Sequence, residues 1–314
     1  MRQRRDAFSS TERVEREVER LAAAQHGVIS RRQAVGGGAT RAFIERRVAS
    51  GRWLTLFPRV YRMAGAPRSW RQQVMAACLA CGDAAAASHR CAGALVALPG
   101  LEKGTAEISV PRRRHIERRG IVVHRVAELA RADVTRIDGI PSTTVTRTLI
   151  DLAGILARDD LEEVLDDALR RRITSVSRLR SRIDALSRRG RPGIGVIDAL
   201  VRARAGVGAV PESVLETRLT QLLRKAGLPR PVAQYPVRDG GRVIARVDLG
   251  YPERRLAIEA DGYRWHSSRV SWDRDIERRN RLTASGWRVV HVTWSDVEDR
   301  PGEVVERVRR ALTL

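Results

Sequence analysis

The amino-acid sequence predicts a multidomain α/β protein. The chain has 314 residues, which is more than one domain of usual size contains. Helical and strand-like periodicities follow one another along it, and a glycine-, alanine- and arginine-rich stretch near 205–212 sets off the last hundred residues. We therefore expect three domains, at 1–66, 67–204 and 205–314.

The charge of the chain points to a polyanionic partner. The formal net charge is +22 and the pI is about 11.4, a balance that favours DNA or another nucleic acid. Only Lys103 and Lys225 are lysines, and GC-rich coding bias accounts for part of the arginine excess. The sequence shows neither an apolar signal segment nor a stretch apolar enough to span a bilayer, so we expect a cytoplasmic protein without membrane contact.

Residues 1–66 have the pattern of a winged helix-turn-helix. A charged helix ends at Gly27, Ser30 and Thr40 cap two further helices, and 53–63 reads as two short strands. In such a fold the third helix enters the DNA major groove. The candidate DNA-binding residues on that helix are Arg41, Arg46 and Arg47. Alternatively, these arginines only solvate an exposed helix face, and the fold serves as a protein adaptor.

Residues 67–204 read as an α+β middle domain without a catalytic constellation. Alanine-rich and amphipathic helices surround two strands, 107–111 and 121–126. The basic turn between these strands either touches phosphates or forms a solvated hairpin. The domain also holds the three cysteines of the chain, and their spacing with His89 is irregular for zinc. We therefore interpret the cysteines as buried structural thiols: Cys78, Cys81 and Cys91.

Residues 205–314 read as an α/β domain in the order α-β-β-β-α-β-α, and acidic residues interrupt two of its strands. Pairing Leu249 with Leu256 would place Asp248 diagonally across from Glu259 on one face of the sheet. Carboxylates this close repel unless a cation or proton compensates, and Mg²⁺ or Mn²⁺ suits oxygen ligands best. The expected metal ligands are Asp248, Glu259 and Asp261. Alternatively, these acids pair with nearby arginines.

Three further residues complete the predicted site. His266 either serves as a catalytic base or acid, or is a histidine of a surface loop. Arg278 either holds a substrate phosphate, as a DNA-binding residue, or forms an i,i+3 ion pair with Asp275. Glu216 has the spacing of a capping box with Ser213, and it could equally project toward the carboxylates as a further catalytic or metal-site residue. The two roles of Glu216 are compatible.

The C-terminal motifs resemble those of a known bacterial family. The motif SVLE ends at Glu216, RVD ends at Asp248, and AIEADG and a Gly-Trp pair follow at 257–262 and 286–287. The family has no known function and is related to the very-short-patch mismatch-repair endonuclease, inside the PD-(D/E)XK nuclease superfamily. The resemblance implies a restriction-endonuclease-like α/β domain with Mg²⁺-dependent nuclease activity. Asp261 stands where that superfamily usually has lysine, so His266 becomes the natural water-activating substitute.

Residues 1 to about 170 resemble the AbiEi-type winged-helix antitoxins of type IV toxin–antitoxin systems. The resemblance rests on the pattern of residues 15–65, which ends in a Val60-Tyr61 pair, on Ser88-His89, and on a GIP motif beginning at Gly139. It implies a DNA-binding head and an AbiEi-like α+β middle domain used for autoregulation or partner contact. The expected protein partners are a second copy of the chain or a cognate toxin-like protein.

Two functions follow from these patterns. The first is a Mg²⁺-dependent DNA endonuclease targeted by the N-terminal winged helix, with a role in DNA repair or phage defence. The second is a non-catalytic AbiEi-like transcriptional regulator or antitoxin that binds DNA. The presence of all three carboxylates favours the first, because a decayed nuclease domain would be expected to lose at least one of them.

Overall fold

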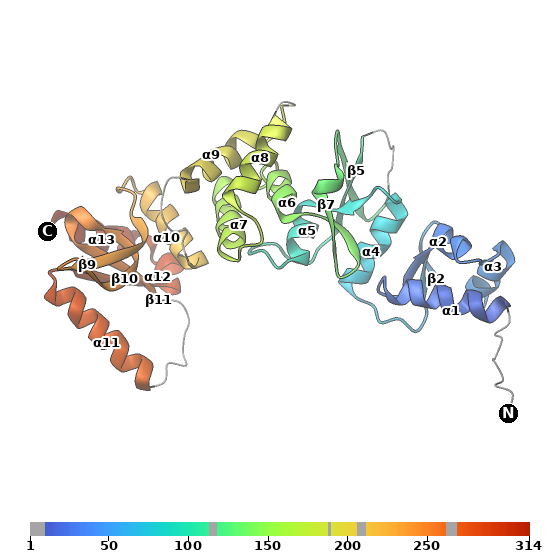
Figure 1. The fold of residues 1–314 in the computed structure, drawn as a ribbon, viewed down its shortest axis with the longest axis horizontal. Coiled ribbons are helices and arrows are strands. Elements are labelled where there is room, and N and C mark those ends of the chain that lie inside the picture. The colour runs from blue at the N-terminus through green and yellow to red at the C-terminus, as the bar shows by residue number, and fades with distance from the viewer. Residues whose placement is uncertain (1–9, 113–117, 188–189, 206–211, 262–268) are drawn as a thin grey trace. The chain divides into compact units, whose positions relative to one another are not determined.

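The computed structural model describes residues 10–112, 118–187, 190–205, 212–261 and 269–314, and these have a mixed α/β fold (Figure 1). The predicted α/β class is therefore confirmed. The chain divides into two units, residues 1–152 and 153–314, and the finer division into three domains stays a prediction. None of the helices within the described ranges combines the length and hydrophobicity that a membrane crossing needs.

The first unit begins with a small helical layer on a three-stranded antiparallel sheet of order β1-β3-β2. Ser30 and Thr40 cap the second and third helices with their hydroxyls, as the sequence predicts. The core contains Phe43 edge-on to Trp53, which also lies against Tyr61. The elements in order are α1 (Ser10–Ala23), β1 (Val28–Ser30), α2 (Arg31–Gly36), α3 (Arg41–Ala49), β2 (Trp53–Phe57) and β3 (Val60–Met63).

The rest of the first unit is built on a five-stranded mixed sheet of order β6-β5-β4-β8-β7. Of the two alternatives for the basic turn between β5 and β6, the solvated hairpin is wrong, because these strands run parallel. All of β5 except its last residue is buried, which is typical of an interior strand rather than one arm of an exposed hairpin. The elements are α4 (Trp70–Cys81), β4 (Ala86–Ala87), α5 (His89–Leu95), β5 (Ala106–Pro111), β6 (Ile121–Val126), the 3₁₀ turn η1 (Arg131–Asp133), β7 (Val134–Ile137), β8 (Ile140–Thr143) and α6 (Val145–Leu152).

The second unit combines three helices with an α/β sandwich. The helices are α7 (Arg158–Arg170), α8 (Val176–Ser187) and α9 (Ile194–Ala205). The sandwich follows in the predicted order, with α12 as an additional helix: α10 (Val214–Lys225), β9 (Val232–Asp239), β10 (Arg242–Tyr251), the 3₁₀ turn η2 (Pro252–Arg254), β11 (Leu256–Asp261), α11 (Arg269–Ala284), β12 (Arg288–Thr293), α12 (Trp294–Asp299) and α13 (Pro301–Thr313).

The sheet of this sandwich has the order β12-β11-β10-β9. The strands β9, β10 and β11 form an antiparallel meander, and β12 pairs with β11 in parallel. One core cluster joins the sheet to α10 and α13 through residues such as Leu219 and Val304. A second cluster joins it to the end of α11 through Leu282. The sheet is therefore packed on both sides, and polar side chains inside it need a specific reason.

The largest buried side chain of the described residues is an arginine of α6. Arg147 is fully buried, and its guanidinium lies 2.8 Å from Asp133 Oδ2 and 3.0 Å from Asp151 Oδ1. It also donates to the backbone carbonyl of Glu128 at 3.0 Å. A buried cation of this kind holds the loop before β7 onto the helix that follows β8.

We predict that Arg147→Met destabilises the protein by about 3–5 kcal/mol, because two buried carboxylates then lose their cation while the volume of the side chain is kept. Urea unfolding followed by circular dichroism measures this loss. The matched control is Arg41→Met, which removes an exposed arginine paired with Glu45 and should leave the transition nearly unchanged. An equal, small effect of both substitutions would contradict the structural role of Arg147.

Candidate functional site

The acidic site lies where the pairing of β10 with β11 ends. The bonded pairs are Tyr251 with Leu256, Gly250 with Ala257 and Leu249 with Ile258. The predicted pairing of Leu249 with Leu256 is therefore wrong by two residues. The reason is a tight connection: Pro252–Arg254 form a single 3₁₀ turn, so the strands pair again at once instead of after a six-residue loop. The shift brings Asp248 closer to Glu259 than predicted.

The side chain of Asp248 takes the place of a backbone acceptor at this point. Its Oδ2 accepts the backbone N–H of Ala260 at 2.8 Å, and its Oδ1 lies 3.4 Å from the amide nitrogen of Gln234. Within the described residues Asp248 has no ion pair, and Arg246 instead pairs with Glu212 at 2.6 Å. The alternative that Asp248 exists to neutralise Arg246 therefore finds no support in the structure.

Glu259 is a buried carboxylate with one arginine beside it. It is only 4% exposed, and Arg278 Nη1 of α11 lies 3.2 Å from its Oε1. Burial is the main cause that raises the pKa of Glu259, and the charge of Asp248 adds to it, while Arg278 and His291 lower it; together they bring the pKa to about 7. The arginine offsets only part of the desolvation, so this carboxyl group keeps its proton to a higher pH than an exposed glutamate does.

Glu216 points from the first turn of α10 toward the same carboxylates. The predicted capping box is half formed: Ser213 Oγ accepts the N–H of Glu216, but Glu216 Oε2 accepts from the backbone of Glu212 and from Gln234 Nε2, both at 2.8 Å. Burial and the neighbouring Asp248 raise the pKa of Glu216, against these hydrogen bonds. Gln234 therefore bridges Glu216 and Asp248.

The backbone of Gln234 has an uncommon conformation for this bridging role. Its φ is +52°, a left-handed value inside a β-strand, and its side chain is buried. Strained residues of this kind persist only where the surrounding contacts require them, and they are frequent at functional sites. Sequence reasoning gave Gln234 no role.

Asp261 pairs with a histidine that sequence reasoning missed. Its Oδ2 lies 3.0 Å from His291 Nδ1, and the register of the parallel strands aligns Glu259 with His291. The Nε2 of His291 is buried and has no hydrogen-bond partner among the described residues. The signal for His291 was its place in an alternating strand, RVVHVT, but only the pairing of β11 with β12 brings it to the acids. The predicted His266 lies outside the described residues.

One oxygen of the buried Glu259 carboxylate is left without a hydrogen bond among the described residues. Glu259 Oε1 is buried and accepts no hydrogen bond within the described part of the chain, although the charged Arg278 is near. A carboxylate oxygen in this state needs a proton or a cation. The charge of Asp248 acts on Glu259, and Asp261 lies two residues further along β11. These three acids do not bring their oxygen atoms within 4.8 Å of one another in the described residues, so joint binding of Mg²⁺ or Mn²⁺ would require their side chains to turn. The one lysine of this unit, Lys225, is paired with Asp159. It therefore does not supply the positive charge beside Glu259 in place of a metal ion.

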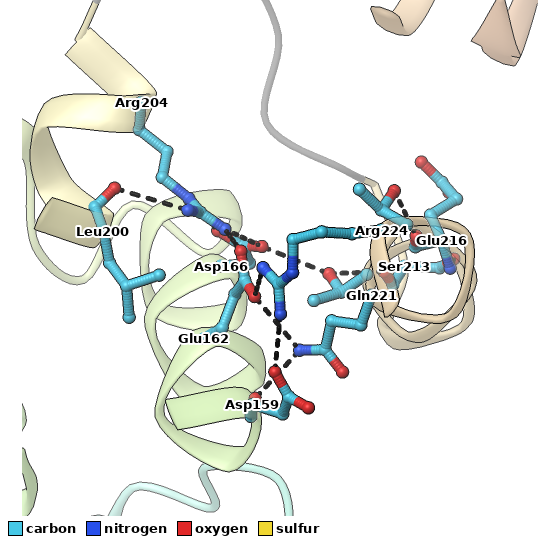
Figure 2. Close-up of polar contacts among 11 residues, drawn as sticks. Asp159, Glu162, Asp166, Leu200, Arg204, Ser213, Glu216, Gln221 and Arg224 are labelled. Carbon is cyan, nitrogen blue, oxygen red and sulfur yellow. Dashed lines mark hydrogen bonds and ion pairs between the residues drawn. The ribbon is translucent and has the colours of Figure 1, made fainter. Parts of the chain in front are cut away.

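The helix that carries Glu216 is held by an ion-pair network. In Figure 2 the acidic side chains of α7 lie between Arg204 of α9 and Arg224 of α10. Arg204 Nη2 is 2.7 Å from Glu162 Oε1 and its Nε is 2.8 Å from Asp166 Oδ1. Arg224 Nη1 reaches the other oxygen of Glu162 at 2.9 Å. Since Glu162 accepts from both arginines, α7 fixes the position of α10 relative to α9.

The predicted DNA-binding arginines of α3 differ in their surroundings. Arg41 and Arg46 are exposed, and Arg41 pairs with Glu45 on its own helix. Arg47 is only 17% exposed at its side chain, lies over the ring of Phe43 and contacts Glu15 of α1. Arg47 therefore holds α3 against α1, whereas Arg41 and Arg46 face solvent. The role of all three stays a prediction.

Comparison with known proteins identifies relatives over about three fifths of the chain and a family model over its last part. The uncharacterized protein Rv2248 of Mycobacterium tuberculosis strain H37Rv is 32% identical over 195 residues, which cover 62% of this chain and 68% of that protein. The uncharacterized protein MT2308 of strain CDC 1551 / Oshkosh is similar to the same extent. The chain belongs to the family of these uncharacterized mycobacterial proteins.

Within this member of the family, residues 216–312 match the family model REase_MTES_1575. The second unit therefore carries a restriction-endonuclease-like domain. The match begins at Glu216 and includes the whole four-stranded sheet, so the carboxylates described above lie inside it. The names of the two mycobacterial relatives state no activity, and the nuclease-like domain is what links this family member to a chemical function.

The raised pKa of Glu259 predicts a pH-dependent stability of the metal-free protein. A carboxyl group whose pKa is higher in the folded state stabilises the fold at low pH, and this contribution is lost as pH rises through about 7. In the presence of a chelator, the contribution of Glu259 to the unfolding free energy should fall by at most about 3 kcal/mol between about pH 4.5 and 7 and stay level above that range.

Urea unfolding at several pH values tests this expectation. Glu259→Gln should flatten the pH dependence, whereas Glu253→Gln, which changes an exposed acid of the same hairpin, should keep it. A pH profile that is the same in wild type and Glu259→Gln would show that this carboxyl group does not titrate as described.

Proposed function

We propose that this protein is a Mg²⁺-dependent DNA endonuclease that hydrolyses phosphodiester bonds in DNA repair or phage defence. The single observation that carries the proposal is the buried oxygen of Glu259, which lacks a hydrogen bond among the described residues and lies beside Asp248. The net charge of +22 supports DNA as the substrate. The restriction-endonuclease-like match supports the reaction class.

Asp248 and Glu259 would hold Mg²⁺ or Mn²⁺, with Asp261 as a third ligand or as a group that orients its neighbours. The ion would supply neutralisation of charge on the scissile phosphate and a more acidic water. The side-chain amide nitrogen of Gln234 donates to the carboxylates of both Asp248 and Glu216, and so it fixes their relative positions. Glu216 of α10 would therefore position the metal ligand Asp248 through Gln234, and it need not bind the metal itself.

Proton movement in this site is assigned to histidine. Asp261 accepts a hydrogen bond from His291 Nδ1. This bond would orient the imidazole ring so that its Nε2 gives or takes a proton. His266, the histidine favoured by sequence, remains a second candidate for the same task. Arg278 now lies 3.2 Å from Glu259 and offsets part of the effect of its burial, and it would turn to a substrate phosphate once a cation takes over that carboxylate.

The N-terminal elements support targeting by a winged helix. The order α1-β1-α2-α3-β2-β3, with β2 and β3 as an antiparallel hairpin, is the order that a winged helix-turn-helix needs. Arg41 and Arg46 of α3 would contact DNA. The same arrangement suits the alternative function, a non-catalytic AbiEi-like regulator or antitoxin that acts with a second copy or a toxin-like partner.

Cleavage assays test the nuclease. Purified protein should cut plasmid, mismatched duplex or single-stranded DNA with Mg²⁺ or Mn²⁺ and should not cut with a chelator. Asp248→Asn and Glu259→Gln should each lower the rate by about 100-fold or more, because each removes a ligand charge from the site. The matched control is Asp239→Asn, an exposed acid at the end of β9, which should cleave at the wild-type rate.

The outcomes of this assay separate the two functions. If no DNA is cut under any of these conditions, the catalytic proposal fails and the regulator becomes the better account. Cleavage that survives both Asp248→Asn and Glu259→Gln would leave a nuclease but would reject this site as its centre.

DNA binding by α3 has its own test, with the full chain in a chelator so that cleavage is excluded. Arg41→Ala combined with Arg46→Ala should weaken binding of duplex DNA and reduce the salt dependence of affinity by about one counterion per arginine. Arg20→Ala, an exposed arginine of α1, is the matched control and should change neither quantity. An unchanged salt slope in the α3 variant would reject this helix as the DNA-binding surface.

A further inference from the structure

A second cluster of ligand-type side chains lies in the first unit, on residues that sequence reasoning did not join. His89 begins α5, Glu107 lies in β5 and His124 in β6. One potential ligand atom of each residue lies within 4.8 Å of the others. The parallel pairing of β5 with β6 brings Glu107 and His124 together, and β4 delivers His89 to the same place.

The three groups are already in direct contact. His124 Nε2 lies 2.8 Å from Glu107 Oε2, and the rings of His89 and His124 are stacked with centroids 3.5 Å apart. His89 and Glu107 are 7% and 8% exposed, so their polar atoms are largely withdrawn from water. Two imidazoles and a carboxylate in such a place are the ligand set of many transition-metal sites.

The backbone and the neighbouring hydroxyls hold His89 in this position. Its φ is +50°, which is uncommon for a residue with a bulky side chain and is maintained only by surrounding contacts. Ser88 Oγ lies 3.0 Å from His89 Nδ1, and Ser109 in turn donates to Ser88 at 2.8 Å. A hydrogen bond at one ring nitrogen directs the other toward a metal, and we assign Nε2 of His89 as the ligand atom.

The chemistry of the cluster favours Zn²⁺ or a similar first-row ion over Mg²⁺. Nitrogen ligands suit the softer ions, and the single carboxylate is partly neutralised by Arg90, whose Nη1 is 3.9 Å from Glu107 Oε1. The two rings lie within 18° of parallel, so binding requires one imidazole to turn about χ2, a torsion that is broad for histidine.

The buried cysteines nearby do not compete for this role. Cys78, Cys81 and Cys91 are free thiols, and burial raises the pKa of each of them. A thiol must lose its proton to bind a metal, so these residues stay neutral core side chains. The interpretation of the cysteines as structural thiols agrees with their burial. The candidate metal ligands of the same unit are His89, Glu107 and His124.

We propose that His89, Glu107 and His124 form a binding site for one Zn²⁺-class transition-metal ion in the first unit. The site has three protein ligands and leaves further positions for water or an anionic group. The site shares no residue with the acidic site of the second unit, and its nitrogen ligands would bind a softer class of ion. It does not depend on whether the second unit cleaves DNA.

Metal titration of the full chain tests the proposal. The background variant is Asp248→Asn combined with Glu259→Gln, which silences the acidic site. After chelator treatment and its removal, this protein should bind one equivalent of Co²⁺ or Zn²⁺, with visible absorption bands of nitrogen- and oxygen-ligated Co²⁺. Adding His124→Ala or Glu107→Gln should weaken binding at least about tenfold.

Two controls keep the test decisive. His26→Ala removes a histidine of the same unit whose ring Nε2 lies 2.8 Å from the backbone carbonyl of Asp138 and which is not part of the cluster, and it should bind the metal normally. Glu107→Gln nearly keeps the shape of the side chain, so circular dichroism can establish that it folds if His124→Ala does not. Absence of one-equivalent binding in the background variant, or unchanged affinity in folded Glu107→Gln, would overturn the proposal.

Discussion

The backbone N–H of Ala260 donates to the carboxylate of Asp248, and the pairing of β10 with β11 stops at this bond. Every other feature of the acidic site depends on that substitution of a side chain for a backbone acceptor. It holds Asp248 beside Glu259, where burial and mutual repulsion raise the pKa of the latter. A site of this kind stores an unfavourable electrostatic interaction that a divalent cation would relieve.

Apolar packing on both sides of the sheet offsets the unfavourable electrostatic energy of the buried carboxylates. Leu219 and Val304 are fully buried against one face and Leu282 against the other, so the strands cannot move apart to hydrate their carboxylates. The network of Arg204, Glu162 and Arg224 fixes α10, and with it Glu216 and its contact to Gln234. The helices before the sandwich thus help to define the site although they lie outside the matched domain.

Local patterns predicted much of this, and non-local pairing accounts for what they missed. Alternation along single strands singled out Asp248, Glu259 and Asp261, and capping residues such as Ser30 and Thr40 marked helix starts correctly. The predicted register of β10 with β11 was wrong because a 3₁₀ turn at Pro252–Arg254 makes the loop shorter than expected. His291, and the contact of His124 with Glu107, depend on parallel strands whose partners are distant in sequence.

The central claim is that the carboxylates at the end of the β10–β11 ladder hold a divalent cation. The most direct measurement is a crystal structure of the protein soaked in Mn²⁺, with the ion located by its anomalous scattering. The account predicts a peak at roughly 2.2 Å from an oxygen of Asp248 and an oxygen of Glu259. A fully bound Mn²⁺ only at other residues, or none at these two carboxylates at saturating concentration, would contradict it.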